Sequence, residues 1–272
     1  MWGIVEFVKG IWMIRFSVVM PTFNRAFCID TAIEHILNQT YQNFELLIID
    51  DGSTDNTDLH IGEKYAREIK SGKIVYHKLK KNSGVAFARN TGLDLAKNDW
   101  IVYADTDNTV RTNFLEAFAD AIRENPKTKT FYARIQFLKA GETLGRPFDY
   151  DRLCRGNYID MGVFCHHKSL VEELGGFDTN IRRLVDYDLI LAYTKYYPPI
   201  YIDKVLMDYN DKNDFKRITN SEVGNMQYIY QKHNITIKKM LFPRWVARII
   251  CCFIPSRKNR NGFMVNHVRY KK

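Results

Sequence analysis

The stretch WIVYADTDN, residues 100–108, joins a short hydrophobic run to two acidic residues, Asp105 and Asp107, that stand one residue apart. A run rich in β-branched and aromatic residues is typical of a buried strand, so we expect the two carboxylates to lie at a strand end. Mg²⁺ and Mn²⁺ prefer carboxylate and phosphate oxygens as ligands. The pair therefore predicts a site for a cation and a diphosphate. Because acidic residues also gather in ordinary turns, this prediction depends on the sequence around the pair.

Three further hydrophobic runs precede this stretch, and each is followed by turn residues and then by apolar residues at helical spacing. The four runs are FSVVM (16–20), FELLIID (44–50), KIVYHKL (73–79) and WIVYA (100–104). Regular alternation of strands and helices predicts βαβ units, which build a mostly parallel central sheet flanked by helices. We therefore predict an α/β fold. One helix is expected to begin near Asp30 or Thr31, and another to follow Thr112 and end before Pro126.

Polar residues follow all four runs. The segments are PTFNR (21–25), DDGSTDNT (50–57), NSGVAFARN (82–90) and DTDN (105–108). Ligands of open α/β sheets bind outside the carboxyl ends of the strands, so these segments are predicted to meet at one binding site. Asp, Gly, Ser and Asn are also common turn residues, which explains each segment singly but not the order in which they occur.

In this order and at these intervals, the four segments resemble the motifs of the family 2 glycosyltransferases, which have the GT-A fold. The resemblance covers residues 15–210. It implies a nucleotide-sugar donor, most simply a UDP-sugar, and a catalytic domain with a donor-binding half at 15–108 and an acceptor-binding half at 109–210. Residues 1–14 would be an N-terminal extension, and residues 211–272 a basic, helical C-terminal segment.

The resemblance also implies which residues bind the donor. Phe23 would form an apolar wall beside the uracil, the Asp51 carboxylate would accept a hydrogen bond from the uracil N–H, and Arg89 would contact the diphosphate. Asp105 would hold the ribose or a metal-bound water. The implied donor-binding residues are Pro21, Thr22, Phe23, Asn24, Arg25, Asp51, Gly84, Arg89, Asp105 and Thr106. From the residues alone, Phe23 could also be a core aromatic residue and Arg89 part of a surface salt bridge.

A divalent cation, Mg²⁺ or Mn²⁺, is the implied cofactor, with Asp107 as its main ligand and Asp105 as a second one. A cation at the diphosphate would stabilise the charge that develops on the departing nucleoside diphosphate. Asn108 stands where many members of the family carry a further acid. We therefore expect phosphate and water to supply more of the metal ligands here.

The segments LGGFD (174–178) and LVDYD (184–188) stand where members of the family carry a GGFD loop and an E-D-x-D motif. The resemblance implies that Asp186 is the catalytic base, because an ionised Asp can take the proton of the attacking hydroxyl. Attack from the side opposite the nucleotide inverts the anomeric centre. Val185 replaces the usual Glu. Asp188 is a weaker candidate for the base, and either acid could instead cap the following helix.

The expected acceptor contacts are Gly176, His166 and Asp188. Gly176 would let the loop approach the acceptor closely, although a glycine here also suits the end of a helix. Two adjacent residues of a strand point to opposite faces, so at most one of His166 and His167 can face the site. We favour an acceptor contact or plain packing over metal ligation for that histidine.

The net charge of +9 is concentrated in the C-terminal segment. Residues 211–272 carry 14 Lys and Arg against three acids, and no acid follows Lys232. Basic residues interleaved with apolar ones suit an anionic membrane surface, and the helix expected between Pro243 and Pro255 is too short to span a bilayer. We expect peripheral association with the membrane and a saccharide or lipid-linked saccharide acceptor, as in cell-surface polysaccharide or lipopolysaccharide synthesis. The alternative is a helix that packs on the catalytic domain.

Length and composition indicate a folded globular protein with one main domain. The chain has 272 residues, of which 46% are hydrophobic. Its five cysteines are odd in number and lack the CxxC spacing of metal sites, so they are expected to be core thiols in a reducing compartment. The first 14 residues make no convincing secretory signal. These features favour a cytoplasmic location.

Two other classes of function were weighed. A nucleic-acid binder would explain the basic tail, but the first 210 residues are slightly acidic and contain no recognition motif. A nicotinamide-dependent oxidoreductase would explain the alternation of strands and helices. However, PTFNR stands after the first strand where a dinucleotide-binding G-x-G-x-x-G is expected. Glycosyl transfer is therefore the favoured interpretation, and nucleic acid an unlikely partner.

Overall fold

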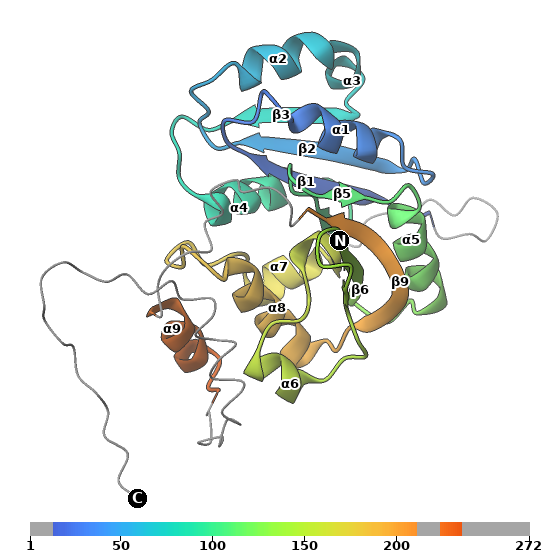
Figure 1. Cartoon of the computed structure of the whole chain (residues 1–272), viewed down its shortest axis with the longest axis vertical. Coiled ribbons are helices and arrows are strands. Elements are labelled where there is room, and N and C mark those ends of the chain that lie inside the picture. Colours follow the sequence, from blue (N-terminus) through green and yellow to red (C-terminus); the bar gives the residue numbers. More distant parts are fainter. Residues whose placement is uncertain (1–12, 211–223, 236–272) are drawn as a thin grey trace, which may run out of the picture.

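The computed structural model describes residues 13–210 and 224–235 (Figure 1). The predicted N-terminal extension lies almost wholly outside these ranges, and so does the helix expected between Pro243 and Pro255. Within the two ranges, no helix is long and apolar enough to cross a membrane.

The strands and helices alternate through the first half of the chain, as the sequence predicts. In chain order the elements are β1 (Phe16–Thr22), α1 (Ile29–Leu37), β2 (Phe44–Asp50), α2 (Thr57–Lys64), α3 (Ala66–Lys70), β3 (Ile74–Lys78), α4 (Val85–Leu95), β4 (Trp100–Tyr103), β5 (Thr109–Val110), α5 (Phe114–Glu124), β6 (Thr130–Phe137), β7 (Thr143–Leu144), α6 (Tyr150–Arg155), the 3₁₀ helix η1 (Met161–Val163), β8 (Phe164–His167), α7 (Ser169–Leu174), α8 (Val185–Tyr196), β9 (Ile200–Tyr209) and α9 (Gly224–Lys232).

The strands of the described residues form one nine-stranded sheet in the order β3-β2-β1-β4-β8-β6-β9-β5, with β7 paired to β6. The α/β class is confirmed. Parallel pairing joins β3, β2, β1 and β4, the four strands that the sequence identified. Beyond β4 the pairing is mixed, and four of the five pairs described there are antiparallel. The four strands predicted from the sequence end at residue 104, and this second half of the sheet was not predicted.

Helices cover both faces of the sheet because alternate residues of each strand point to opposite sides. On one face, Val18 and Met20 of β1 belong to a core that includes α1 and α5. On the other face, Val19 of β1 packs in a second core with α4, α7 and α8. The sheet is thus the middle layer of three. The central strands are buried on both sides and read as continuous hydrophobic runs for that reason.

The last long strand, β9, curves around the lower part of the molecule in orange in Figure 1. Its parallel pairing with β6 shifts register on both sides of Arg134. Such irregularities increase the local twist of a strand and bend it. The bend brings the end of β9 to the end of β4, where the backbone N–H of Asn210 donates a 3.2 Å hydrogen bond to Oδ1 of Asn108.

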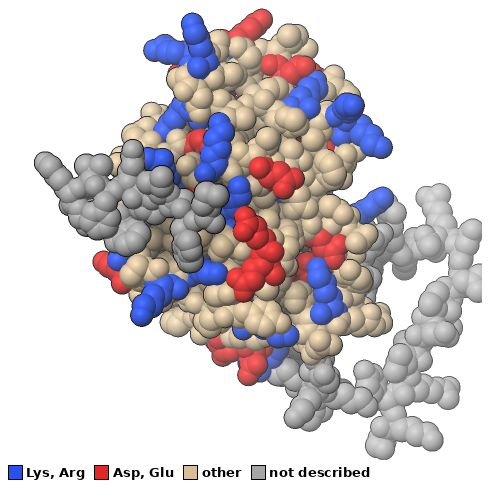
Figure 2. Space-filling model, turned by 180° about the vertical axis from the view of Figure 1, so that it is seen from behind, with Lys and Arg blue, Asp and Glu red and all other residues tan. Residues whose placement is uncertain are grey.

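The surface charge of the described residues is mixed. Figure 2 shows Lys and Arg interspersed with Asp and Glu on the face opposite that of Figure 1, with several acidic side chains near its centre. A basic stripe of the kind that follows a nucleic-acid backbone is not seen on that face within the described part of the chain. The excess of positive charge lies in residues 211–272.

Candidate active site

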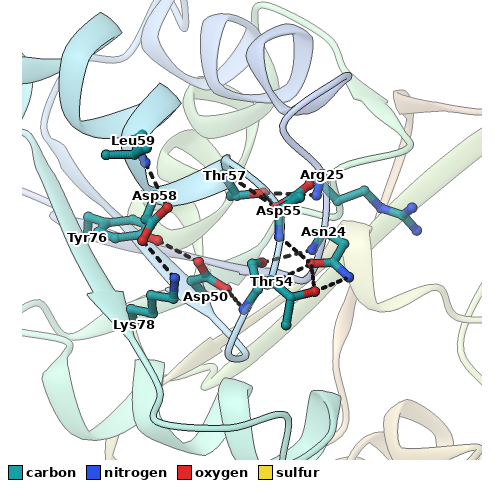
Figure 3. A network of polar contacts seen from close by, with 11 residues as sticks. Asn24, Arg25, Asp50, Thr54, Asp55, Thr57, Asp58, Leu59, Tyr76 and Lys78 are labelled. Atoms are coloured by element: carbon teal, nitrogen blue, oxygen red, sulfur yellow. Dashed lines mark hydrogen bonds and ion pairs between the residues drawn. The ribbon is translucent and has the colours of Figure 1, made fainter.

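The loops that follow β1 and β2 are fastened to each other through Asn24 (Figure 3). Its side-chain Oδ1 accepts hydrogen bonds from the backbone N–H groups of Thr54 at 2.8 Å and Asp55 at 3.3 Å, and its own N–H donates to Oγ of Ser53 at 2.8 Å. Asn24 has a φ of 53°, in the left-handed region that Asn tolerates better than most residues. Asn24 therefore shapes these two loops. We call the loops after β1, β2 and β3 the donor-side loops, because the sequence assigned donor binding to them.

Asp50, the last residue of β2, is buried and belongs to the same hydrogen-bond network. Its carboxylate accepts hydrogen bonds from the N–H of Ser53 at 2.7 Å and from the hydroxyl of Tyr76 at 2.5 Å (Figure 3). Burial and the neighbouring Asp50 both raise the pKa of Tyr76, which therefore stays a hydrogen-bond donor. Asp50 has both oxygens engaged within the protein, and it serves the structure of the loop.

Asp51 fastens the loop after β3 to the loop after β2. Its two carboxylate oxygens accept hydrogen bonds from the N–H groups of Ser83 at 2.7 Å and Gly84 at 2.8 Å. Gly84 precedes the first residue of α4 with a φ of 93°, a conformation that favours glycine. Each carboxylate oxygen can accept a second hydrogen bond, so the contact expected between Asp51 and uracil stays compatible with this geometry.

The remaining donor-side residues lie around these loops. Phe23 is 40% exposed, so it is not the core aromatic residue of the alternative interpretation. The hydroxyl of Thr22 is buried and has no hydrogen-bond partner within the described part of the chain. The backbone N–H of Arg25 donates to Oγ1 of Thr57 at 3.1 Å, and its guanidinium points away from the loop network in Figure 3. Pro21 and Thr106 are half-buried.

Arg89, on α4, lies between the two acids that the sequence assigned to opposite sides of the reaction. Its Nη2 donates to Oδ1 of Asp105 at 3.2 Å, and its Nη1 contacts Oδ1 of Asp186. The Arg89 side chain is 4% exposed, whereas those of Asp105 and Asp186 are 31% and 38% exposed. The structure therefore buries the cation and leaves both carboxylates partly open to a ligand.

Burial and charge compete at this cluster. Burial disfavours the charge of Arg89, but Asp186 and Asp105 outweigh that effect and raise its pKa. Burial also raises the pKa of Asp105; Arg89 opposes this rise, and the neighbouring Asp107 and Asp186 add to it. The guanidinium stacks near Tyr103 and Phe177, with Cζ 5.8 and 5.3 Å from the ring centroids. The cluster carries more negative than positive charge and would gain from a further cation.

A divalent cation fits the residues at the end of β4. Asp105 and Asp107 are both half-buried, and the charge of Asp107 contributes to the raised pKa of Asp105. A cation between them would relieve that repulsion. In the described ranges, no group of three or more His, Cys, Asp or Glu gathers as a metal site. Asn108 is buried and accepts the hydrogen bond from Asn210, so it is committed to the fold.

The first turn of α8 presents Asp186 and Asp188 in different directions. Asp186 contacts Arg89, whereas Asp188 is 2% exposed and paired with Lys232 and His233. Leu184, just before the helix, has a φ of 60°, which is unusual for a bulky residue and marks a constrained corner. Because Asp188 has both oxygens paired in the interior, this geometry favours Asp186 as the acid that can meet a ligand.

The other expected acceptor residues have internal partners. A Cβ added at Gly176 would lie 2.5 Å from Oδ1 of Asn90, so Gly176 allows the loop to pack on α4. His166 is fully buried, its Nε2 lies 2.8 Å from the hydroxyl of Tyr103, and burial lowers its pKa to about 4. His166 therefore packs as a neutral core residue, as the second of the two interpretations predicted. This geometry gives no support to an acceptor contact by His166 or Asp188.

Sequence reasoning missed two residues at the site. Asn90, the last residue of NSGVAFARN, holds the backbone of Phe177 by accepting from its N–H and donating to its C=O, both at 2.8 Å. Asp160 precedes η1 and accepts a hydrogen bond from Gly162 N–H at 2.8 Å. Burial, and then the nearby charge of Asp105, raise the pKa of Asp160 to about 7. Asn90 was visible in the motif, whereas no sequence pattern pointed to Asp160.

The chain is similar in sequence and in fold to known glycosyltransferases. The chain is 31% identical over 161 residues to "Glycosyltransferase GlyG" of Streptococcus pneumoniae, a match that spans 58% of this chain and 48% of that protein. The fold is similar to Staphylococcus aureus TarS in complex with UDP-GlcNAc, with a TM-score of 0.64 and 19% identity over 81% of this chain and 65% of that one.

A second structural neighbour is the mannosyltransferase PcManGT from Pyrobaculum calidifontis, solved with GDP-Man and Mn²⁺. Its TM-score is 0.54, with 22% identity over 71% of this chain and 56% of that one. At these identities the two structures show a shared GT-A fold. The model of "Glycosyl transferase family 2" matches residues 17–167, which include all four strand-end segments and most of the sheet. The chain belongs to glycosyl transferase family 2.

Proposed function

We propose that this protein is an inverting glycosyltransferase that moves a sugar from a nucleotide-sugar donor to a hydroxyl of a saccharide or lipid-linked saccharide. The observation that carries the proposal is the position of Arg89 between Asp105 and Asp186. Asp105 follows the donor-side strand β4 by two residues, and Asp186, the proposed base, lies in the first turn of α8. A single buried cation thus joins the two groups that the transfer reaction needs close together.

The donor is proposed to bind across the ends of β1, β2 and β4. Phe23 offers an exposed ring for the base, and Asp51 retains acceptor capacity for a uracil N–H. Arg89 is 4% exposed and is proposed to act from behind Asp105, where its charge offsets that carboxylate beside the diphosphate. A UDP-sugar is the donor that these contacts favour. TarS was solved with UDP-GlcNAc and PcManGT with GDP-Man, so nucleotide sugars are what similar folds bind.

Mg²⁺ or Mn²⁺ is the proposed cofactor, held by Asp107 and Asp105 together with phosphate and water. When bound, the cation supplies electrostatic stabilisation to the nucleoside diphosphate that leaves. The protein's part is to keep two partly exposed carboxylates at the end of β4. The Mn²⁺ bound in PcManGT supports this choice of metal.

Asp186 is proposed to remove the proton from the acceptor hydroxyl. As that oxygen forms its bond to the anomeric carbon, the bond between the sugar and the phosphate breaks and the electron pair leaves with the diphosphate. The displacement is a single step, so the anomeric centre inverts. Arg89 holds the carboxylate of Asp186 toward the donor side, which pre-organises the base before the acceptor binds.

The role in cell-surface polysaccharide or lipopolysaccharide synthesis, on the cytoplasmic face of a membrane, is proposed from the basic segment at 211–272. Deletion of residues 238–272 should abolish sedimentation with vesicles that contain anionic lipid and leave turnover of a soluble acceptor unchanged. The control is neutral vesicles, with which neither protein should sediment. Undiminished sedimentation of the truncated protein would show that this segment does not bind the membrane.

The proposed function is tested by a donor screen with Mn²⁺ and a panel of UDP-, GDP- and dTDP-sugars, with nucleotide release measured in the presence and absence of lipid extract. Release from a UDP-sugar that requires both the metal and an acceptor is the expected result. Asp107→Asn should prevent it, whereas Asp120→Asn, an exposed carboxylate on α5, should not. Full transfer by both Asp107→Asn and Asp186→Asn would rule out the mechanism.

A further inference from the structure

The second acid of LVDYD is held in the interior by two residues at the end of the described chain. Nζ of Lys232, the last residue of α9, lies 2.7 Å from Oδ2 of Asp188, and Nε2 of His233 lies 2.8 Å from Oδ1. The Asp188 side chain is 2% exposed and that of His233 is 7% exposed. Ile229, one turn earlier, is fully buried in the same core as α8. The Lys232 side chain is 35% exposed, so α9 meets α8 through a shared apolar core and an ionic contact that is buried on the Asp188 side.

The same helix also holds the loop that leads into α8. Lys232 bridges from Asp188 to Oδ2 of Asp178, at 2.9 Å, and the hydroxyl of Tyr228 donates to that oxygen at 3.0 Å. Nδ2 of Asn225 donates to the carbonyl of Arg183 at 3.3 Å. These contacts reach the GGFD loop and the residue just before Leu184. α9 thus contacts the corner of residues 178–188 from its beginning to its end.

This corner has weak local support of its own. Leu184 occupies the N-cap position of α8, where it makes no side-chain capping hydrogen bond, and its backbone is in the left-handed region. Residues two apart on a helix are rotated by about 200° around its axis, because the helix has 3.6 residues per turn, so they lie on nearly opposite sides. Lys232 of α9 therefore contacts Asp188 on one side of the first turn of α8, while Asp186 contacts Arg89 on another side.

We propose that Lys232 and His233 are positioning residues for the reaction: through Asp178 and Asp188 they fix where the first turn of α8 presents Asp186. The inference rests on the proposed function, in which Asp186 is the base. It assigns a role to a helix outside the region matched by the family model, which ends at residue 167. Lys232 and His233 act through Asp188 and do not contact substrate.

The inference is tested with Lys232→Met, the charge-keeping Lys232→Arg, and Lys195→Met as a matched control at an exposed lysine of α8. UDP affinity in the presence of Mn²⁺ is measured by calorimetry, turnover by nucleotide release with acceptor, and local opening by hydrogen exchange. Lys232→Met should lower kcat ~10- to 100-fold, because displacement of a catalytic group by about 1 Å can cost that much. Its UDP affinity should change less than ~2-fold, and exchange should rise in residues 178–190 alone.

Lys232→Arg should recover most of the turnover, and Lys195→Met should match the wild-type enzyme. If Lys232→Met does not fold, the double variant Asp188→Asn/Lys232→Met removes the buried charge together with its partner and should show the same loss of kcat. Wild-type turnover in either folded variant, or a loss of UDP affinity in step with kcat, would overturn the positioning role.

Asp186→Asn, assayed alongside, separates this inference from the function on which it rests. Full turnover in Asp186→Asn overturns the assignment of the base. An inactive Asp186→Asn variant beside an unchanged Lys232→Met variant overturns the positioning role alone.

Discussion

The donor-side loops and the base-bearing corner of residues 178–188 are held by different kinds of interaction. In the donor-side loops, the side chains of Asn24 and Asp51 accept hydrogen bonds from backbone N–H groups of a neighbouring loop, and that of Asp50 accepts one from its own loop. At the base-bearing corner, charged side chains from two distant helices hold the acids: Arg89 from α4 contacts Asp186, and Lys232 from α9 bridges Asp178 and Asp188.

The difference has consequences for the two halves of the site. Backbone N–H groups carry no net charge, so the hydrogen bonds of the donor-side loops should depend less on salt than a partly exposed ion pair does. Ion pairs weaken with salt where they are partly exposed, and they fail when one partner is removed. The donor-side loops should therefore be less sensitive to salt. The base-bearing corner depends on a few charged residues that are far apart in sequence.

The largest expected effect is that of Asp186→Asn, which removes the proposed base and leaves the donor-side loops untouched. We expect kcat to fall about 10²- to 10⁴-fold, the range typical of a lost general base, with UDP affinity unchanged. Nucleotide release and calorimetry measure the two quantities. A parallel fall in UDP affinity would mean that the two halves of the site are not separable.

Arg89→Met should damage both halves at once, because it leaves Asp105 and Asp186 without their shared cation. Loss of one partner of a buried pair is costly, and with the acids one-third exposed we expect about 2–3 kcal/mol of lost stability. UDP affinity and kcat should both fall. Arg89→Lys should restore little, since an ammonium cannot contact two separate carboxylates as a guanidinium fork does. Full activity in Arg89→Lys would contradict the bridging role.

Asn90→Ala should loosen the contact between the two halves without removing a charge. The variant loses two 2.8 Å hydrogen bonds to the backbone of Phe177, at a cost of about 1–3 kcal/mol for groups left unpaired. Turnover should fall more than UDP affinity. Thr91→Ala, on the exposed side of the same helix, is the control. Chemical denaturation measures the loss of stability, and steady-state kinetics measure turnover. Equal behaviour of the two variants would contradict the role of Asn90 in holding the backbone of Phe177.

The smallest effect on turnover is expected from Asp160→Asn. Its effect on stability should depend on pH. Burial and the charge of Asp105 raise the pKa of Asp160 to about 7, from an ordinary value of 3.8. The folded protein thus binds this proton more tightly than the unfolded chain does. The resulting stability is complete below pH ~4 and is lost as the pH rises to ~7.

Asp160→Asn is neutral at every pH and can keep the hydrogen bond to Gly162. Its Tm should equal that of the wild-type protein near pH 4 and exceed it near pH 8, by about 2–4 °C for each kcal/mol recovered. Differential scanning calorimetry across this range measures the difference. A Tm gap that does not change with pH would show that Asp160 does not titrate in this way.

The sequence predicted strands β1 to β4 well because the information for them is local. Strand, turn and helix signals recur within each 30-residue unit, and Asp51 and Gly84 stand in short motifs at the ends of adjacent strands. The four predicted strands are β1, β2, β3 and β4, which pair in parallel with one another. The mixed pairing beyond β4 was missed because β6 and β8 carry no alternation that distinguishes a parallel from an antiparallel neighbour.

The base-bearing corner was less predictable for a physical reason. Asp188 and Lys232 are 44 residues apart, and no sequence pattern around either residue predicts their contact. His166 illustrates the same limit, because its place beneath Tyr103 follows from the pairing of β8 with β4 and not from its own neighbours. Asp186 itself was found only through the resemblance of LVDYD to a family motif.

The close approach of Gly176 to Asn90 limits how this chain could be recombined with its relatives. Asn90 belongs to a donor-side motif, yet its amide seats a loop of the other half, and a side chain at position 176 would collide with it at 2.5 Å. A chimera with a foreign acceptor half would therefore have to inherit both residues as a matched pair.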